Sequence, residues 1–352
     1  MCETIYIEKN KSSRFGVHFY NDSTEWNVFL ESCGVNADKL AVIYNKNIEN
    51  ETWKAFAEAK NNKAVLPISA EDANKSASVR NFLEQNKENY TFVILEEPFI
   101  METIRGIVTS DDYKLSYILV PVTPFAQFDS VSIRPKTDLV GDIITKEIFP
   151  LGIYVDTSVI LNAKTQYFLG GIACAFRLAV SYKASMFEWM ISNLYELLDC
   201  EAEAVCELLC RGYNVHKERI EKDTAKERSL PVYGRDFYTL FSQMKSESSE
   251  ADLLALSMVC QSYLSWKSEL LSMEEYYEIR DMFVAFGLAI TETFATDEEL
   301  MDALERTESD LIAGKEGVYI RKLGKMVIMN APSKELIKEA FGQIYYNEYE
   351  NE

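Results

Sequence analysis

The strongest constraint on the fold is a change of pattern near residue 164, which divides the chain into two unlike halves. Before it, short apolar runs alternate with stretches whose apolar residues recur at helical spacing, such as 51–59 and 76–85. The short runs are the candidate strands 40–44, 63–68, 91–95, 117–120 and 153–155. Because strands that alternate with helices need crossover connections, this half predicts an α/β domain with a parallel sheet.

After residue 164 the chain has long amphipathic stretches, few helix breakers and few β-branched runs. The predicted helices are 166–181, 185–198, 201–224, 237–244, 251–271 and 273–286. A short β-like pair, 317–321 and 325–329, surrounds Leu323 and Gly324. We therefore predict an α/β domain over 1–160 and an α-helical domain over 161–352. Such a pair of domains is typical of proteins with a small-molecule cleft between them.

The composition indicates which partners are unfavourable and in which cellular compartment we expect the protein. The net charge of −20 repels phosphate backbones and anionic lipids, so nucleic acid and membrane surfaces are poor partners. No apolar run is long enough to span a bilayer, and the N-terminus lacks the apolar core of a signal peptide. Seven cysteines, an odd number without regular spacing, favour a reducing compartment over a disulfide framework. We expect a cytoplasmic protein.

Several motifs occur in one order along nearly the whole chain. They are VPVTPFAQFDS (120–130) with Lys136-Thr137 after it, YVDT (154–157), the helical stretch 255–288 and GVYIRKLGKMVI (317–328). In order and spacing they resemble the substrate loop, the next strand, the late helix pair and the closing hairpin of 3-dehydroquinate synthases. The resemblance runs in register over roughly residues 38–342.

This resemblance implies a Rossmann-like N-terminal domain that binds NAD and a helical C-terminal domain that carries a catalytic zinc. Members of the family form homodimers. They cyclise a seven-carbon sugar phosphate acid with release of phosphate, a lyase step of the shikimate pathway. Related cyclases with the same fold use other sugar phosphates.

The cofactor turn of the family is altered in this chain. In the family, a Gly-Gly-Gly turn followed by Gly-Asp lets the backbone approach the pyrophosphate. Here the strand 91–95 is followed by Glu96, Glu97 and Pro98, and Glu102 holds the aspartate position. Two carboxylates would face the pyrophosphate, and proline lacks an N–H donor. We predict a turn that no longer binds NAD, and the alternative is a variant dinucleotide site.

The positions of the family's zinc ligands are also altered. The glutamate falls on Cys174, the first histidine on Arg235 and the second on Glu250. An arginine stays protonated and cannot ligate zinc, and the only histidines are His18 and His216. We therefore expect no zinc. We also predict that Arg235 and Glu250 form an ion pair in place of the metal.

Several cations of the family's substrate site remain in the sequence. The candidate anion- or substrate-binding residues are Asp129, Arg134, Lys136, Arg177, Arg228 and Arg235. If the five cationic residues of this set converge on the cleft between the domains, they form a site for a small anion. The alternative is that each cation pairs with one of the 56 carboxylates.

Three cysteines, Cys200, Cys206 and Cys210, precede His216 in a pattern that superficially suggests a metal site. Their surroundings are amphipathic helix, in which cysteine behaves as a small apolar residue. We therefore predict that they belong to the core.

The sequence therefore favours a binding or scaffold protein that is inert as a cyclase and dimeric. One alternative is an active 3-dehydroquinate synthase or a divergent sugar-phosphate cyclase or lyase. A second alternative is the inactive half of a hetero-oligomer whose active partner is a paralogue.

Overall fold

The structure is a computed structural model divided into two compact units. It describes residues 3–10, 13–59, 62–69, 75–98, 100, 104, 107, 115–130, 149–222, 233–242, 244, 248–292, 311 and 314–344. The first unit comprises Met1–Gly171 and Val205–Ser229, and the second comprises Ile172–Ala204 and Leu230–Glu352.

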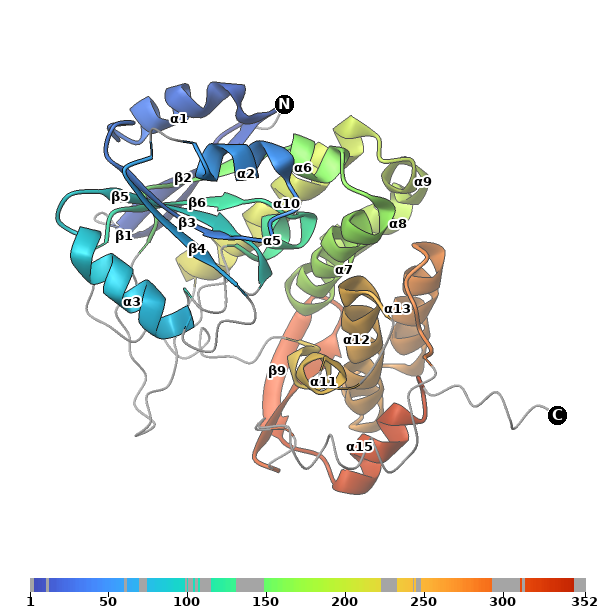
Figure 1. The fold of residues 1–352 in the computed structure, drawn as a ribbon. Coiled ribbons are helices and arrows are strands. Elements are labelled where there is room, and N and C mark those ends of the chain that lie inside the picture. Colours follow the sequence, from blue (N-terminus) through green and yellow to red (C-terminus); the bar gives the residue numbers. More distant parts are fainter. Residues whose placement is uncertain are drawn as a thin grey trace. The chain divides into compact units, whose positions relative to one another are not determined.

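The first unit contains a sheet of seven strands (Figure 1). The strands are β1 (Ile5–Asn10), β2 (Ser13–Tyr20), β3 (Leu40–Asn45), β4 (Ala64–Ile68), β5 (Thr91–Glu96), β6 (Tyr117–Pro121) and β7 (Gly152–Asp156). Their order is β1-β2-β7-β6-β5-β3-β4, in which β1 and β2 are antiparallel and all other neighbours are parallel. The predicted α/β domain with a parallel sheet is confirmed.

The middle strands read as continuous apolar runs because helices cover both faces of the sheet. Every residue of β6 and β7 is buried. The helices of this unit are α1 (Trp26–Ser32), α2 (Glu51–Ala57), α3 (Lys75–Asn86), α5 (Pro124–Asp129), α6 (Ser158–Leu161), the start of α7 (Thr165–Tyr182) and most of α10 (Ala202–Lys222).

An aromatic cluster under α1 and α2 fixes these helices on the sheet. The Trp26 and Tyr154 rings contact each other, and each also contacts the rings of Phe29 and Trp53. In these edge-to-face or tilted contacts the ring centroids lie 5.2–5.7 Å apart. Such pairs add directional contacts to the burial of large apolar surfaces. The Asn50 side chain caps α2 by accepting from the Trp53 N–H, which positions the Trp53 indole in the cluster.

The second unit is mainly helical. It contains the rest of α7 together with α8 (Ala184–Ser192), α9 (Leu194–Leu198), α11 (Arg235–Phe241), α12 (Glu250–Lys267), α13 (Met273–Ala285) and α15 (Lys334–Phe341). A hairpin of β8 (Glu316–Lys322) and β9 (Lys325–Asn330) completes it, as the late β-like pair predicted. The single helix predicted over 185–198 is broken at Asn193, whose side chain turns back to the Trp189 carbonyl at 2.8 Å.

Each unit is made of two segments of the chain, whereas the sequence predicted two continuous domains with a boundary between residues 160 and 161. Residues 205–229, with most of α10, group with the first unit. The reason is the apolar face of α10, on which Val205, Leu208 and Leu209 are fully buried. On the same helix, the ring of Tyr213 contacts Phe19 of β2 edge-on at 5.6 Å.

The turn of the β8–β9 hairpin depends on a glycine. Gly324 has φ +75°, and its N–H donates to the Val180 carbonyl at 2.8 Å. A Cβ atom at this position would lie 2.3 Å from the Ala184 nitrogen. Both the backbone conformation and the close approach therefore require glycine.

None of the helices in the described part of the chain is long and apolar enough to cross a bilayer.

Candidate functional site

The carboxyl edge of the first sheet contains a topological switch point. From β3 the chain adds β4 on one side, and then places β5, β6 and β7 on the other side. In open α/β sheets, ligands bind in the crevice at the carboxyl ends of the two strands where the order reverses. Here those strands are β3 and β5, which end at Asn45 and Glu96.

Side chains of the protein bridge this crevice. The Asn45 amide donates a hydrogen bond from Nδ2 to the carboxylate of Glu97. Glu96 and Glu97 are only 3% and 8% exposed, so two carboxylates are buried where β5 ends. The chain becomes helical at Pro98, directly after them. Our sequence interpretation missed Asn45, although a polar residue that directly follows the apolar run LAVIY marks the carboxyl end of a strand.

The charge of Glu96 acts on two buried tyrosines. Burial, and after it the Glu96 carboxylate, raises the pKa of Tyr117. The pKa of Tyr213 on α10 is raised by burial and by the same carboxylate, against the effect of its hydrogen bond with Ser130. Both phenols therefore stay neutral at physiological pH and serve as hydrogen-bonding or packing groups.

Asp156, the last residue of β7, is held by several donors. Its carboxylate accepts hydrogen bonds from Trp53 Nε1 at 3.0 Å and from the Ser158 hydroxyl at 2.6 Å. Its backbone carbonyl accepts from Gln127 Nε2 at 2.7 Å. Burial raises the pKa of Asp156, and the hydrogen bonds from Ser158 and Trp53 oppose this shift. These partners make Asp156 an internal link between β7, α2 and α5.

The segment that resembles the family's substrate loop forms α5 and packs against α10. His216 donates from Nε2 to the Phe128 carbonyl at 2.6 Å, and the Ser130 and Tyr213 hydroxyls share a hydrogen bond of 3.1 Å. Asp129, a predicted substrate-binding residue, lies between these two contacts in the sequence and is only 5% exposed. The loop is thus tied to α10 on both sides of Asp129.

The predicted cations are only partly described. Arg134, Lys136 and Arg228 lie outside the described residues, as does Glu102 of the cofactor turn. Arg177 is 7% exposed and donates to Cys174 Sγ on its own helix at 3.7 Å. Arg235 is exposed at the first residue of α11. The convergence of these cations on one anion site stays a prediction.

At two of the three predicted metal-ligand positions, the residue present is a poor zinc ligand. Cys174 is fully buried beside the Arg177 guanidinium, and Arg235 carries a fixed positive charge. Within the described ranges, no group of three His, Cys, Asp or Glu residues could hold a metal ion.

The predicted ion pair between Arg235 and Glu250 is not among those that the described residues form. The pKa of Glu250 is raised by desolvation alone, whereas a neighbouring guanidinium would lower it. Although the Glu250 side chain is exposed, neighbouring protein atoms displace part of the water around its carboxylate. The two residues begin α11 and α12 as separate charges.

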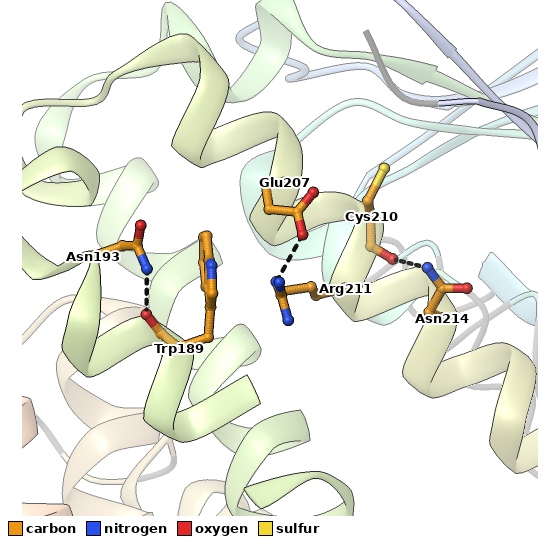
Figure 2. A network of polar contacts seen from close by, with 6 residues as sticks. All are labelled: Trp189, Asn193, Glu207, Cys210, Arg211 and Asn214. Atoms are coloured by element: carbon orange, nitrogen blue, oxygen red, sulfur yellow. Dashed lines mark hydrogen bonds and ion pairs between the residues drawn. The ribbon is translucent and has the colours of Figure 1, made fainter. Parts of the chain in front are cut away.

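Within the part of the chain that the structure describes, Cys206 and Cys210 belong to no metal-binding group with His216. The Nε2 atom of His216 donates to the Phe128 carbonyl. Figure 2 shows the polar contacts around Cys210: its carbonyl accepts from Asn214 at 2.9 Å, and Glu207 pairs with Arg211 at 2.8 Å. Cys33, Cys174, Cys200, Cys206 and Cys260 are free.

Comparison with known proteins finds relatives by sequence and neighbours by structure. No family model matches the chain. The 3-dehydroquinate synthase of Thermoanaerobacter pseudethanolicus is 21% identical over 68% of this chain and 69% of its own length. The 3-dehydroquinate synthase of Thermodesulfovibrio yellowstonii is 24% identical over 74% of this chain and 75% of its own length.

Solved structures share the fold over almost the whole chain. The 2-epi-5-epi-valiolone synthase of Streptomyces hygroscopicus, with NAD+ and Zn2+ bound, has a TM-score of 0.67 at 15% identity and covers 95% of this chain and 97% of its own. A 2-deoxy-scyllo-inosose synthase complexed with carbaglucose-6-phosphate, NAD+ and Co2+ also has a TM-score of 0.67, at 14% identity, and covers 96% of this chain and 99% of its own.

Proposed function

The chain belongs to the 3-dehydroquinate synthase family, and we propose that it keeps the fold of these sugar-phosphate cyclases without their cofactor-dependent chemistry. In this proposal it is a binding or scaffold protein that is inert as a cyclase. The observation that carries the proposal is the pair of buried carboxylates, Glu96 and Glu97, at the switch point of the first sheet.

The residues at the switch point do not fit a dinucleotide. A pyrophosphate needs close backbone approach and N–H donors, which glycines and a helix N-terminus supply. Here Glu96 and Glu97 would place negative charge against negative charge in a site shielded from water. Pro98 has no N–H to donate, and the Asn45–Glu97 hydrogen bond already spans the crevice.

The described metal positions do not fit a catalytic zinc either. Zinc needs three protein ligands that can be neutral or anionic, plus an open position. Arg235 brings a permanent positive charge to one of these positions, and Cys174 is a buried thiol beside a second guanidinium. We therefore derive no reaction step through a metal or a dinucleotide.

The finer expectations remain parts of the proposal. A small anionic ligand would depend on Arg177 together with Arg134, Lys136 and Arg228, outside the described residues. A cytoplasmic location, a homodimer and pairing with an active paralogue are likewise expectations. Co-purification of the paralogue from the native source would identify this chain as the inactive half of a hetero-oligomer.

The proposal is tested by three measurements on freshly purified protein. They are calorimetry with NAD+, elemental analysis for zinc, and phosphate release from a seven-carbon sugar phosphate acid. We expect no binding heat, no stoichiometric metal and no phosphate, because the turn is acidic and the ligand set is incomplete. The Thermodesulfovibrio yellowstonii relative, assayed in parallel, is the positive control.

Stoichiometric zinc or NAD+ binding in the micromolar range would overturn the proposal. Phosphate release would then establish the alternative, an active 3-dehydroquinate synthase or a divergent sugar-phosphate cyclase.

A further inference from the structure

Two glycines lie side by side on the face of the first sheet that Phe29 of α1 covers. Gly16 of β2 and Gly152 of β7 are partners in the parallel register, so side chains at these positions would point to the same face. Neighbouring strands are about 4.8 Å apart. The absence of two neighbouring side chains leaves room on this face, and side chains from elsewhere fill it.

Two of the side chains in this room are a histidine and a cysteine. A Cβ atom on Gly16 would have His18 Nε2 as its nearest neighbour, and a Cβ atom on Gly152 would have Cys33 Sγ as its nearest neighbour, at 2.8 Å. His18 belongs to β2, and Cys33 directly follows α1. Both residues are half-buried. An imidazole nitrogen and a thiol therefore lie over neighbouring strands, on the same face of the sheet.

The imidazole of His18 is oriented by a hydrogen-bond partner. Thr4 Oγ1 lies 3.4 Å from His18 Nδ1. When Nδ1 carries the ring proton it donates to Thr4, and Nε2 keeps its lone pair over Gly16. Burial lowers the pKa of His18, which favours this neutral ring. A histidine whose second nitrogen is held by a hydrogen bond is the usual form of a metal-binding histidine.

The thiol of Cys33 is free and has the character of a soft ligand. Burial raises the pKa of Cys33, and the hydrogen bond with Ser32 opposes the shift, so the thiol is not a preformed nucleophilic thiolate. Sγ lies 3.9 Å from the Ser32 hydroxyl and from the Leu151 carbonyl. Contacts of this length are weak, and a metal ion can replace them.

We propose that Cys33 Sγ and His18 Nε2 bind one Cu(I) ion as a two-coordinate site over Gly16 and Gly152. Metal–sulfur and metal–nitrogen bonds of about 2.3 Å and about 2.0 Å together span roughly 4 Å, which is close to the spacing of the two strands. On binding, the S–H bond of Cys33 breaks, an S–Cu bond forms and the proton passes to water.

The number of ligands selects the ion. In the described ranges no three His, Cys, Asp or Glu residues could hold a metal together, so zinc, which needs at least three protein ligands, does not fit. Cu(I) is a soft ion that prefers thiolate ligands and accepts two-fold coordination. The Phe29 ring, 5.3 Å from the His18 ring between centres, supplies an apolar surrounding.

The general properties of the protein are compatible with this ion. The net charge of −20 attracts cations. The reducing compartment that the sequence favours keeps thiols reduced and copper monovalent. The inference goes beyond the proposed function and does not depend on the loss of the NAD and zinc sites, because none of its residues belongs to them.

The test is anaerobic competition for Cu(I) between the full chain and a chromophoric Cu(I) chelator. We expect the wild type to withdraw Cu(I) from the chelator. Cys33→Ser and His18→Phe should each bind at least about tenfold more weakly, since the loss of even an outer partner of a metal ligand costs this much. Cys200→Ser is the matched control, because Cys200 is also a free, half-buried cysteine and should leave the affinity unchanged.

Labelling with iodoacetamide, read by peptide mass spectrometry, locates the ion. Chelator-buffered Cu(I) should slow the labelling of Cys33 in the wild type but not in His18→Phe, and should leave the labelling of Cys200 unchanged. Circular dichroism of each variant checks that it is folded. A wild type that takes no Cu(I) from the chelator overturns the proposal. So does labelling of Cys33 that Cu(I) does not slow, or that it slows equally in His18→Phe.

Discussion

Individual polar residues of the first unit are satisfied by partners from distant parts of the chain. The Asp156 carboxylate takes hydrogen bonds from Trp53 and Ser158, and the Asn45 amide bonds to Glu97. Each of these groups could in principle serve a ligand, but here it holds neighbouring elements together. These hydrogen bonds therefore link β7 to α2 and the end of β3 to the end of β5.

His18 provides a residue-scale prediction on pH. Burial lowers the pKa of His18, which is half-buried against Phe29 at 5.3 Å between ring centres. A lowered pKa favours the neutral ring in the folded state, so the stability that it contributes is present above the ordinary value of 6.5 and is lost as pH falls below it. Replacing the ring by phenylalanine removes this titration.

We expect the wild type to lose more unfolding free energy than His18→Phe between about pH 7.5 and about pH 5.5, by on the order of 1 kcal/mol or less. Urea unfolding at several pH values measures this difference. His216 is present in both proteins, so its contribution cancels in the difference between them. Equal pH dependence of the two proteins would contradict the prediction.

At the scale of elements, α12 shows why polar residues occur inside the second unit. The helix is buried along most of its length, yet it contains Gln261, Ser262 and Ser265. Ser262 bonds to the Tyr233 hydroxyl, while the other two hold the edge of β8. The polar residues face backbone groups or hydroxyls that would otherwise be buried without a partner.

We therefore expect Ser265→Ala to lower the free energy of unfolding. It removes the acceptor of the buried Ile320 N–H, and an unsatisfied buried donor costs about 1–3 kcal/mol. Ser192→Ala is the matched control, because both hydroxyls donate to the carbonyl four residues earlier but Ser192 is exposed. Denaturant unfolding should show a clear loss for Ser265→Ala and almost none for Ser192→Ala. Equal effects of the two substitutions would mean that the hydrogen bond from Ile320 to Ser265 does not contribute to stability.

At the scale of the whole molecule, net charge opposes self-association. The charge of −20 makes two copies repel at distances up to the screening length of the solution.

The sequence alone predicted five of the seven strands of the first sheet and the late hairpin, in their order along the chain. The five predicted strands correspond to β3–β7, and the predicted pair near Gly324 is the β8–β9 hairpin. This succeeds because periodicity, strand-sized apolar runs and turn residues act between neighbours in the chain. It also identified the acidic turn at Glu96 and Glu97, since a change of charge in a motif is visible without coordinates.

Only the tertiary structure decided which partner each polar group has. The Trp53–Asp156 bond joins residues 103 apart, and the Gln261–Val318 bond joins residues 57 apart. It also grouped α10 with the first unit, and showed Arg235 and Glu250 as separate charges where an ion pair was predicted. Such contacts depend on how whole elements pack, and packing is set by many weak interactions that no local pattern contains.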